Sequence, residues 1–255
     1  DVTGVQTCAL PISNIHKFEN VYPDALIEYA NLFNIKYDAI IVDEAQDFQE
    51  NYWIATEALL KPDSYLYIFF DDNQNLFEGD ITFQGLIDED PFTLIENCRN
   101  TKSIHNHVKA FHSNPILVAR NAPQGRTPKW TSYCLDSELR IGLRKELNRL
   151  HNIGNVPLEN IVILTPKSEK NSILKEGVKL GNYVLSWYKK EGTVFVSTIQ
   201  SFKGLERLVV IIAEIDKEVP RIENLLYTGC SRAVGELTCF YNEGLEHLII
   251  EKGLT

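Results

Sequence analysis

The sequence of 255 residues predicts an α/β fold made of two units. Two short apolar runs, residues 39–42 and 65–70, are each followed directly by a pair of acids, as expected of buried parallel strands that end at a ligand site. Similar runs alternate with stretches of helical periodicity along most of the chain. The length suffices for two domains of ordinary size. We therefore expect parallel sheets flanked by helices.

The first residues are expected not to be native protein. Residues 2–12 read VTGVQTCALPI, which resembles the translation of a sequencing-library adapter. A signal peptide is the alternative, but the segment has no basic start and only a very short apolar stretch. We therefore assign residues 1–13 to a non-native segment and expect the natural protein to begin further upstream.

The first unit is expected over residues 14–90. A helix is predicted from Pro23, because proline is favoured in a first turn and the apolar residues that follow recur at helical spacing. The strands 39–42 and 65–70 come next. The acids that follow them should lie at the carboxyl edge of the sheet, where ligands bind in such folds.

The second unit is expected over residues 91–255, with the boundary near residues 88–91, and it continues the alternation. Strands are predicted at residues 92–95, 116–118, 130–133, 161–164, 184–187, 194–198, 208–213 and 237–241. Helices are predicted from about residue 101, along Leu139, Leu143, Leu147 and Leu150, and from residue 220 to about 232. The sequence shows no internal repeat.

Composition limits the function classes. The balance of 25 basic and 35 acidic residues gives a net charge of −10, so contact with nucleic acid should be local. No apolar run approaches the ~20 residues that a membrane span needs. The five cysteines are scattered without a CxxC pair and indicate neither a zinc site nor a disulfide framework. We expect a soluble cytoplasmic protein.

Residues 40–48, IIVDEAQDF, give the strongest indication of function. A magnesium nucleotide needs a hard oxygen ligand, and hydrolysis needs a second carboxylate to orient and deprotonate water. Asp43 fits the metal role and Glu44 the role of base. An acidic pair after a strand is also consistent with a helix N-cap or a surface turn.

The string DEAQD resembles motif II, the Walker B element, of UvrD/Rep-like superfamily 1 helicases. Further segments follow in that family's order, namely residues 67–77 for motif III, 94–101 for motif IV, 196–210 for motif V and 225–233 for motif VI. The resemblance covers about residues 23–241. It implies the RecA-like P-loop NTPase fold, with a partial first RecA-like domain, a complete second one, and ATP and Mg²⁺ as cofactors.

The resemblance also implies roles for single residues. Gln74 would sense the γ-phosphate, Arg99 and Arg232 would contact it, and Glu206 would meet the ribose. Guanidinium groups offer paired donors to the spread negative charge of the transition state. Since both arginines belong to the second unit, hydrolysis would depend on closure of the two units. Taken alone, each arginine is more typical of a solvated surface residue, and the motifs reverse that interpretation.

Single-stranded DNA, or RNA, is the partner that the resemblance implies. The candidate contacts are Phe77 and, in the motif V segment, Thr198, Gln200 and Ser201. The chain departs from the family at four positions. Phe70 replaces a glycine, and Gln200 replaces a histidine. Gly79 stands where the family often has an aromatic that stacks on a base, and Cys98 stands where it has a tyrosine that stacks on adenine. These departures predict weaker stacking near Phe77 and weaker base selectivity.

Two absences bear on activity. None of the 14 glycines is followed by lysine, so the sequence contains no GxxxxGK[ST] phosphate-binding loop. We expect the chain to need the missing N-terminal part of the same protein for nucleotide binding. Only about thirty residues separate residues 164 and 196, which leaves no room for a large accessory domain.

Several alternatives remain open at this stage. The lead hypothesis is an ATP-dependent DNA helicase or translocase, and a RecA-like regulatory or scaffolding protein is the rival. A two-metal nuclease built on the acids at positions 43, 44, 47, 71 and 72 would leave the arginines unexplained. His105, His107 and His112 lie near Cys98, but their spacing favours capping and solvation of a helix over a metal site.

Overall fold

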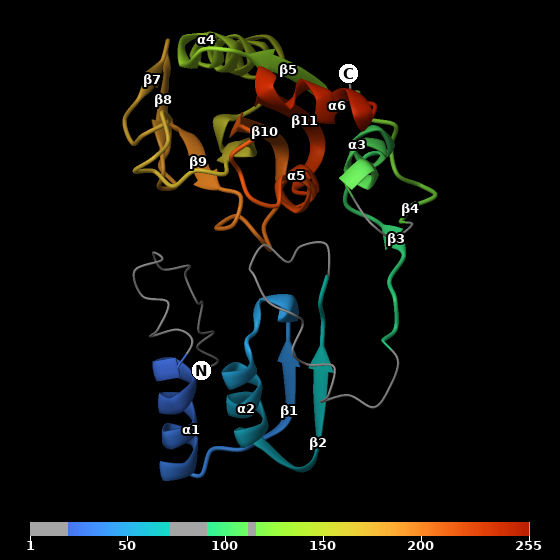
Figure 1. The fold of residues 1–255 in the computed structure, drawn as a ribbon, viewed down its shortest axis with the longest axis vertical. Helices are drawn as coiled ribbons and strands as arrows, with labels where there is room; N and C mark the ends of the chain where they lie inside the picture. The colour runs from blue at the N-terminus through green and yellow to red at the C-terminus, as the bar shows by residue number, and fades with distance from the viewer. Residues whose placement is uncertain (1–19, 72–90, 112–115, 255) are drawn as a thin grey trace. The chain divides into compact units, whose positions relative to one another are not determined.

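The computed structural model describes residues 20–71, 91–111 and 116–254 (Figure 1). The chain divides into two compact units, residues 1–93 (unit 1) and 94–255 (unit 2). Among the helices within the described residues, none combines the length and the apolarity that crossing a membrane requires.

The described part of unit 1 contains a two-stranded parallel sheet and two α-helices. The elements are α1 (Tyr22–Leu32), β1 (Tyr37–Val42), α2 (Glu50–Ala58) and β2 (Leu60–Ile68). The helix predicted from Pro23 and both strands are confirmed, and Pro23 lies in the first turn of α1. A small core gathers Val42, Ala45 and Trp53 at the carboxyl end of β1.

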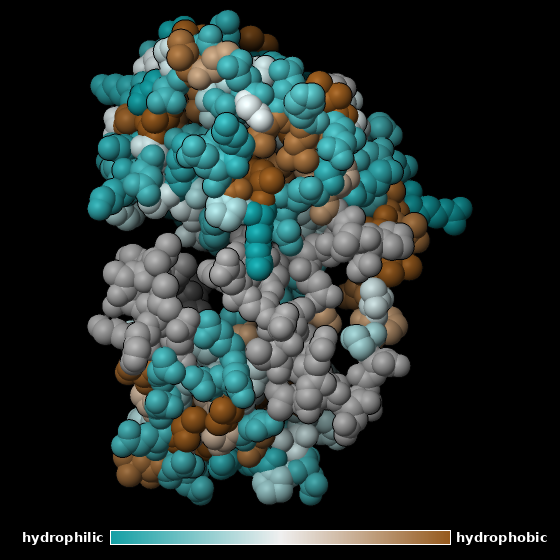
Figure 2. Space-filling view, viewed as in Figure 1, coloured by the Kyte–Doolittle hydropathy of each residue, from teal (hydrophilic) through white to brown (hydrophobic). Residues whose placement is uncertain are grey.

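The prediction that both strands of unit 1 are buried is wrong for most of their length. Only Val42 of β1 is buried, and the side chains of Ile41 and Tyr65 are exposed. The described part of unit 1 has two strands and two helices, so its apolar side chains are not covered on both faces. Figure 2 shows hydrophobic side chains of this unit at the surface.

Unit 2 is built on a seven-stranded sheet in the order β5-β11-β10-β6-β9-β8-β7. Its strands are β5 (Lys129–Tyr133), β6 (Ile161–Thr165), β7 (Lys179–Leu180), β8 (Tyr183–Ser186), β9 (Val194–Thr198), β10 (Arg207–Ile215) and β11 (Ala233–Asn242). Every pairing is parallel except that of β7 with β8. A separate parallel pair joins β3 (Glu96–Asn97) and β4 (Leu117–Val118).

Helices cover both faces of this sheet (Figure 1). They are α3 (Lys102–Val108), α4 (Asp136–Leu147), α5 (Ile222–Cys230) and α6 (Glu246–Glu251). The four predicted leucines of α4 and the π-helical turn after it are buried against one face. On α5, Gly229 approaches the other face so closely that an added Cβ would lie 3.0 Å from Ile212 and 3.2 Å from Ile199. The mixed α/β architecture is thus confirmed, whereas its RecA-like identity stays a prediction.

Two local predictions for unit 2 are wrong. Residues 92–95 form no strand, and pairing begins only where the Leu117 amide donates to the Ile95 carbonyl. Phe92 is 90% exposed, so the apolar run that indicated a strand there has no sheet to pack against. His105 is buried and not solvated, because its side of α3 faces inward with Ile104 and Val108.

Candidate functional site

In unit 1, Asp43 and Glu44 lie directly beyond the carboxyl end of β1. Glu44 has a left-handed backbone (φ 55°), and the following amide, of Ala45, donates to the Phe69 carbonyl at 2.9 Å. This turn ends the strand and carries the acids to the edge of the sheet. The side chain of Asp43 is exposed, and its Oδ1 accepts a hydrogen bond from the Glu44 amide at 2.9 Å.

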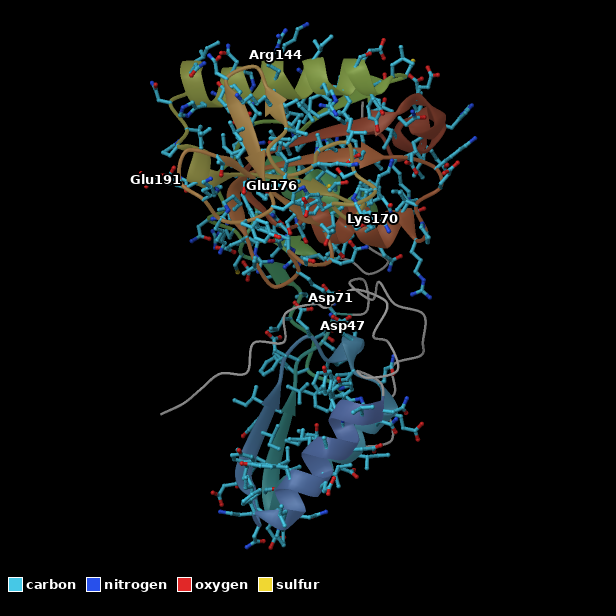
Figure 3. The ribbon with its side chains drawn as sticks, turned by 90° about the vertical axis from the view of Figure 1, so that its left-hand side faces the viewer. Asp47, Asp71, Arg144, Lys170, Glu176 and Glu191 are labelled. Carbon is cyan, nitrogen blue, oxygen red and sulfur yellow. The ribbon has the colours of Figure 1, made fainter. Side chains whose placement is uncertain are left out.

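Gln46 joins the ends of the two strands and orients Glu44. Its buried side chain donates from Nε2 to Oε2 of Glu44 at 2.6 Å, and its Oε1 accepts from the Asp71 amide at 3.0 Å. Figure 3 shows Asp47 and Asp71 at this same end of the two strands. The motif pattern suggested no role for Gln46, although the amide inside DEAQD was the available signal.

In unit 2, the structure brings Arg99 and Glu206 together. The Nε atom of Arg99 donates to Oε2 of Glu206 at 2.8 Å, although 107 positions separate them in the sequence. Both side chains are exposed, so water screens the pair. The segments that resemble motifs IV and V therefore meet at one place on unit 2.

Asn100 ties the same place to the segment that resembles motif VI. Its buried Nδ2 donates to the carbonyls of Ser231 at 3.1 Å and of Ala233 at 2.6 Å. Asn97 orients the side chain of Asn100, since Nδ2 of Asn97 donates to Oδ1 of Asn100 at 2.7 Å. The sequence did not single out these two asparagines, because no motif role attaches to them.

In the sequence, Arg232 lies between Ser231 and Ala233, the two residues whose carbonyls accept from Asn100. It is only 1% exposed, and its Nε donates to the Thr228 carbonyl at 3.0 Å. Its Nη2 donates to Oγ of Ser231 at 3.3 Å. Burial excludes a solvated surface arginine at this position.

Thr198, Gln200 and Ser201 lie at the carboxyl end of β9. The Thr198 hydroxyl accepts from the Ser201 amide at 2.9 Å and donates to the Ser201 hydroxyl at 2.8 Å, which forms a compact polar turn. Ser201 is exposed and the other two are partly exposed. The turn presents hydroxyl and amide groups that are suited to a phosphate backbone.

The predicted site residues thus fall into two groups that each lie within one unit. Asp43 and Glu44 lie together in unit 1, and Arg99, Glu206 and Arg232 gather in unit 2. Gln74 and Phe77 lie outside the described residues.

Comparison with protein families finds one match in the region of these motifs. Residues 193–238 match the model of the UvrD-like helicase C-terminal domain, a range that includes Thr198, Gln200, Ser201, Glu206 and Arg232. The resemblance to UvrD-like helicases is thereby confirmed. No curated protein sequence matches the chain.

Two solved structures are similar to parts of the chain. One is the C-terminal domain of a possible DNA helicase from Lactobacillus plantarum WCFS1, at 23% identity and a TM-score of 0.44, covering 57% of this chain and 87% of that one. The other is the PRRSV helicase, at 15% identity and a TM-score of 0.44, covering 79% of this chain and 34% of that one.

Proposed function

We propose that the chain is part of a UvrD-like, ATP-dependent DNA helicase or translocase, in which ATP hydrolysis drives movement along single-stranded nucleic acid. The observation that carries this proposal is the meeting of three motif-like segments on unit 2. Arg99 contacts Glu206, and its neighbour Asn100 holds the backbone on both sides of Arg232. Such convergence is expected of segments that bind one nucleotide.

Unit 1 would supply the hydrolytic half of the ATP site. Mg²⁺ commonly binds one or two carboxylates together with the phosphates of its nucleotide, and the exposed carboxylate of Asp43 at the sheet edge fits that demand. The bound ion would neutralise charge on the phosphates. Glu44, oriented by Gln46, accepts a proton from water while the water oxygen bonds to the γ-phosphorus and the β–γ bridging oxygen leaves with ADP.

Unit 2 would supply the positive charge that stabilises the transition state. Two guanidinium groups, those of Arg99 and Arg232, present planar paired donors that match phosphoryl oxygens. Closure of unit 2 on unit 1 would bring them to the γ-phosphate, and Glu206 to the ribose. Hydrolysis would then occur only in the closed state.

Thr198, Gln200 and Ser201 would hold the nucleic-acid backbone. Their hydroxyl and amide groups donate to phosphate without adding positive charge. We therefore expect affinity to fall with added salt, but less steeply than for a strongly basic protein. A complete protein that does not bind single strands at low salt would count against this assignment.

The sequence contains no phosphate-binding loop, so we propose that the chain does not hydrolyse ATP by itself. The test is ATPase turnover of a longer protein that contains the loop, with and without single-stranded DNA. The proposal expects stimulation by DNA, and turnover without any stimulation would contradict it. A micromolar ATP affinity of the 255-residue chain, measured by calorimetry, would contradict its inactivity.

A RecA-like regulatory or scaffolding protein is the second candidate, and one observation favours it. The guanidinium group of Arg232 is buried, and its hydrogen bonds to Thr228 and Ser231 must be exchanged before it contacts a nucleotide. A scaffold would bind nucleotide or partners without DNA-stimulated turnover, so the same ATPase measurement separates the two candidates.

A further inference from the structure

Tyr188 is an exposed aromatic side chain on the loop between β8 and β9. It is 68% exposed, and among the described residues of unit 2 every other aromatic side chain is buried or half-buried. An exposed tyrosine presents both an apolar ring face and a polar hydroxyl to a partner. The ring of Tyr188 is therefore accessible for stacking.

Two lysines follow Tyr188 directly. Lys189 and Lys190 are both exposed, whereas the whole sequence carries a net charge of −10. The loop contains one acid, Glu191, which Figure 3 shows at the outer edge of unit 2. The loop is thus locally basic beside an exposed ring, a combination that suits bases and phosphates of a single strand.

The backbone under Tyr188 is firmly held. The Trp187 amide donates to Oε2 of Glu176 at 2.6 Å, and the Trp187 indole donates to the Leu174 carbonyl at 2.7 Å. The Tyr188 amide donates to Oγ of Ser186 at 3.2 Å, and that hydroxyl donates to Oε1 of Glu176 at 3.1 Å. The half-buried Trp187 packs on the core, so the chain is fixed where it presents the tyrosine.

The segment that holds Trp187 is itself anchored by a buried carboxylate. Glu214 accepts hydrogen bonds from the Thr165 hydroxyl at 2.7 Å, the Ser172 hydroxyl at 2.5 Å and the Ile173 amide at 2.9 Å. Glu214 lies where the register of β10 shifts and has a left-handed backbone, which turns its side chain inward. The Thr165 carbonyl also accepts a hydrogen bond from the Ile199 amide. This bond connects the Glu214 network to the turn after Thr198.

The loop begins at the end of the strand that neighbours the proposed nucleic-acid contacts. β8 pairs with β9, and Ser186, at the end of β8, lies opposite Phe195. Neighbouring strands are about 4.8 Å apart, and Thr198 is three positions further along β9, or roughly 10 Å. Ser186, two residues before Tyr188, is therefore roughly 11 Å from Thr198, a distance that a few nucleotides can span.

We propose that Tyr188 is a base-stacking platform for single-stranded nucleic acid, with Lys189 and Lys190 contacting the flanking phosphates. This proposal rests on the proposed function, because it extends the path that begins at Thr198. It also supplies an aromatic contact to a chain in which Gly79 stands where the UvrD-like pattern often has a stacking aromatic.

The test uses the full 255-residue chain and an oligo-dT probe of about 15 nucleotides, followed by fluorescence anisotropy at low salt. We expect Tyr188→Ala to weaken binding about tenfold and Tyr188→Phe to bind as the parent does, because the ring alone stacks. Tyr65→Ala is the matched control, since Tyr65 is 66% exposed but lies in unit 1. An abasic probe of equal length should bind parent and Tyr188→Ala equally.

The lysines give a second readout. Replacing both Lys189 and Lys190 by alanine should make the slope of log K against log salt concentration less steep by about 1.4. This is the change expected when contacts to two phosphates of a single strand are lost. If Tyr188→Ala bound oligo-dT like the parent while Thr198→Ala weakened binding, the platform would be wrong and the proposed function would stand. If the parent chain bound no single strand at low salt, the platform would be wrong, and the same measurement on a longer protein that contains the phosphate-binding loop would decide the proposed function.

Discussion

The guanidinium group of Arg99 donates to the carboxylate of Glu206, with 2.8 Å between Nε and Oε2. In the proposed function these two side chains contact different parts of one nucleotide: Arg99 contacts the γ-phosphate and Glu206 contacts the ribose. An exposed ion pair of this kind contributes at most about 1 kcal/mol. Phosphate oxygens could therefore replace the carboxylate as the partner of Arg99 at little cost in free energy.

The two arginines should differ in what they contribute to stability. Arg99→Ala should change the free energy of unfolding by less than about 1 kcal/mol, because the lost pair is solvent-screened. Arg232→Ala should cost about 3 kcal/mol, because it leaves a cavity and removes the buried hydrogen bonds to the Thr228 carbonyl and the Ser231 hydroxyl. Urea unfolding followed by tryptophan fluorescence measures both. Equal losses would contradict the assignment of Arg232 to the interior.

Asn100→Ala should destabilise unit 2 by about 2–3 kcal/mol, because it removes the donor from two buried carbonyls. The same unfolding measurement checks this. The control is Asn152→Ala, an exposed asparagine whose Nδ2 donates to Asn148, where the loss should stay below about 0.5 kcal/mol. Similar losses for the two variants would remove Asn100 as the link between the motif-like segments.

In a longer protein that hydrolyses ATP, Glu44→Gln should bind MgATP but lose turnover, because the amide keeps the shape of the side chain without accepting the proton. Gln46→Ala should lower turnover by a smaller factor, on the order of tenfold, since Glu44 stays present but loses its orienting hydrogen bond. Steady-state turnover and ATP affinity measured together check both variants. Near-normal turnover of Glu44→Gln would show that another group is the base.

Periodicity and motif order predicted much of this fold. Except for the two-residue edge strand β7, which was not predicted, the strands of the large sheet and the leucine face of α4 follow from apolar spacing that local sequence displays directly. The exposure of the strands in unit 1 could not be predicted in this way, because burial depends on which other elements cover a strand. The local sequence around Ile41 would be the same whether its side chain were covered or exposed, and it is exposed. The strand expected at residues 92–95 failed for the same reason.

For the site, the acids and arginines carry recognisable motifs, but the residues that position them do not. Asn100 acts through hydrogen bonds to carbonyls 131 and 133 positions away, and no local pattern encodes such contacts. Gln46 orients a residue only two positions away, but its second bond, from the Asp71 amide, spans 25 positions. The roles of the ten predicted site residues stay predictions. Within unit 1 the structure places Asp43 and Glu44 at one sheet edge, and within unit 2 it brings Arg99 and Glu206 together.

Cys134 should react slowly with alkylating reagents although it is exposed. Its thiol donates to Oε2 of Glu243 at 2.7 Å, which favours the protonated form and raises the pKa of Cys134 to about 11. The thiolate is the reactive species, so little is present near pH 8 and the rate should rise steeply toward pH 11. Iodoacetamide labelling with mass spectrometry checks this. Glu243→Gln should speed labelling near pH 8, and an unchanged rate would show that Glu243 does not suppress the thiolate.

The central claim is that unit 2 carries the arginines of an ATP site whose acids lie in unit 1. The most direct measurement is turnover and ATP affinity of Arg99→Ala, Arg232→Ala and Arg232→Lys in a longer protein that contains the phosphate-binding loop. We expect each alanine variant to lose roughly 10³-fold or more in turnover, with a smaller effect on affinity, and lysine to rescue poorly because it lacks planar paired donors. Turnover within tenfold of the parent, still stimulated by DNA, would contradict the claim at that arginine.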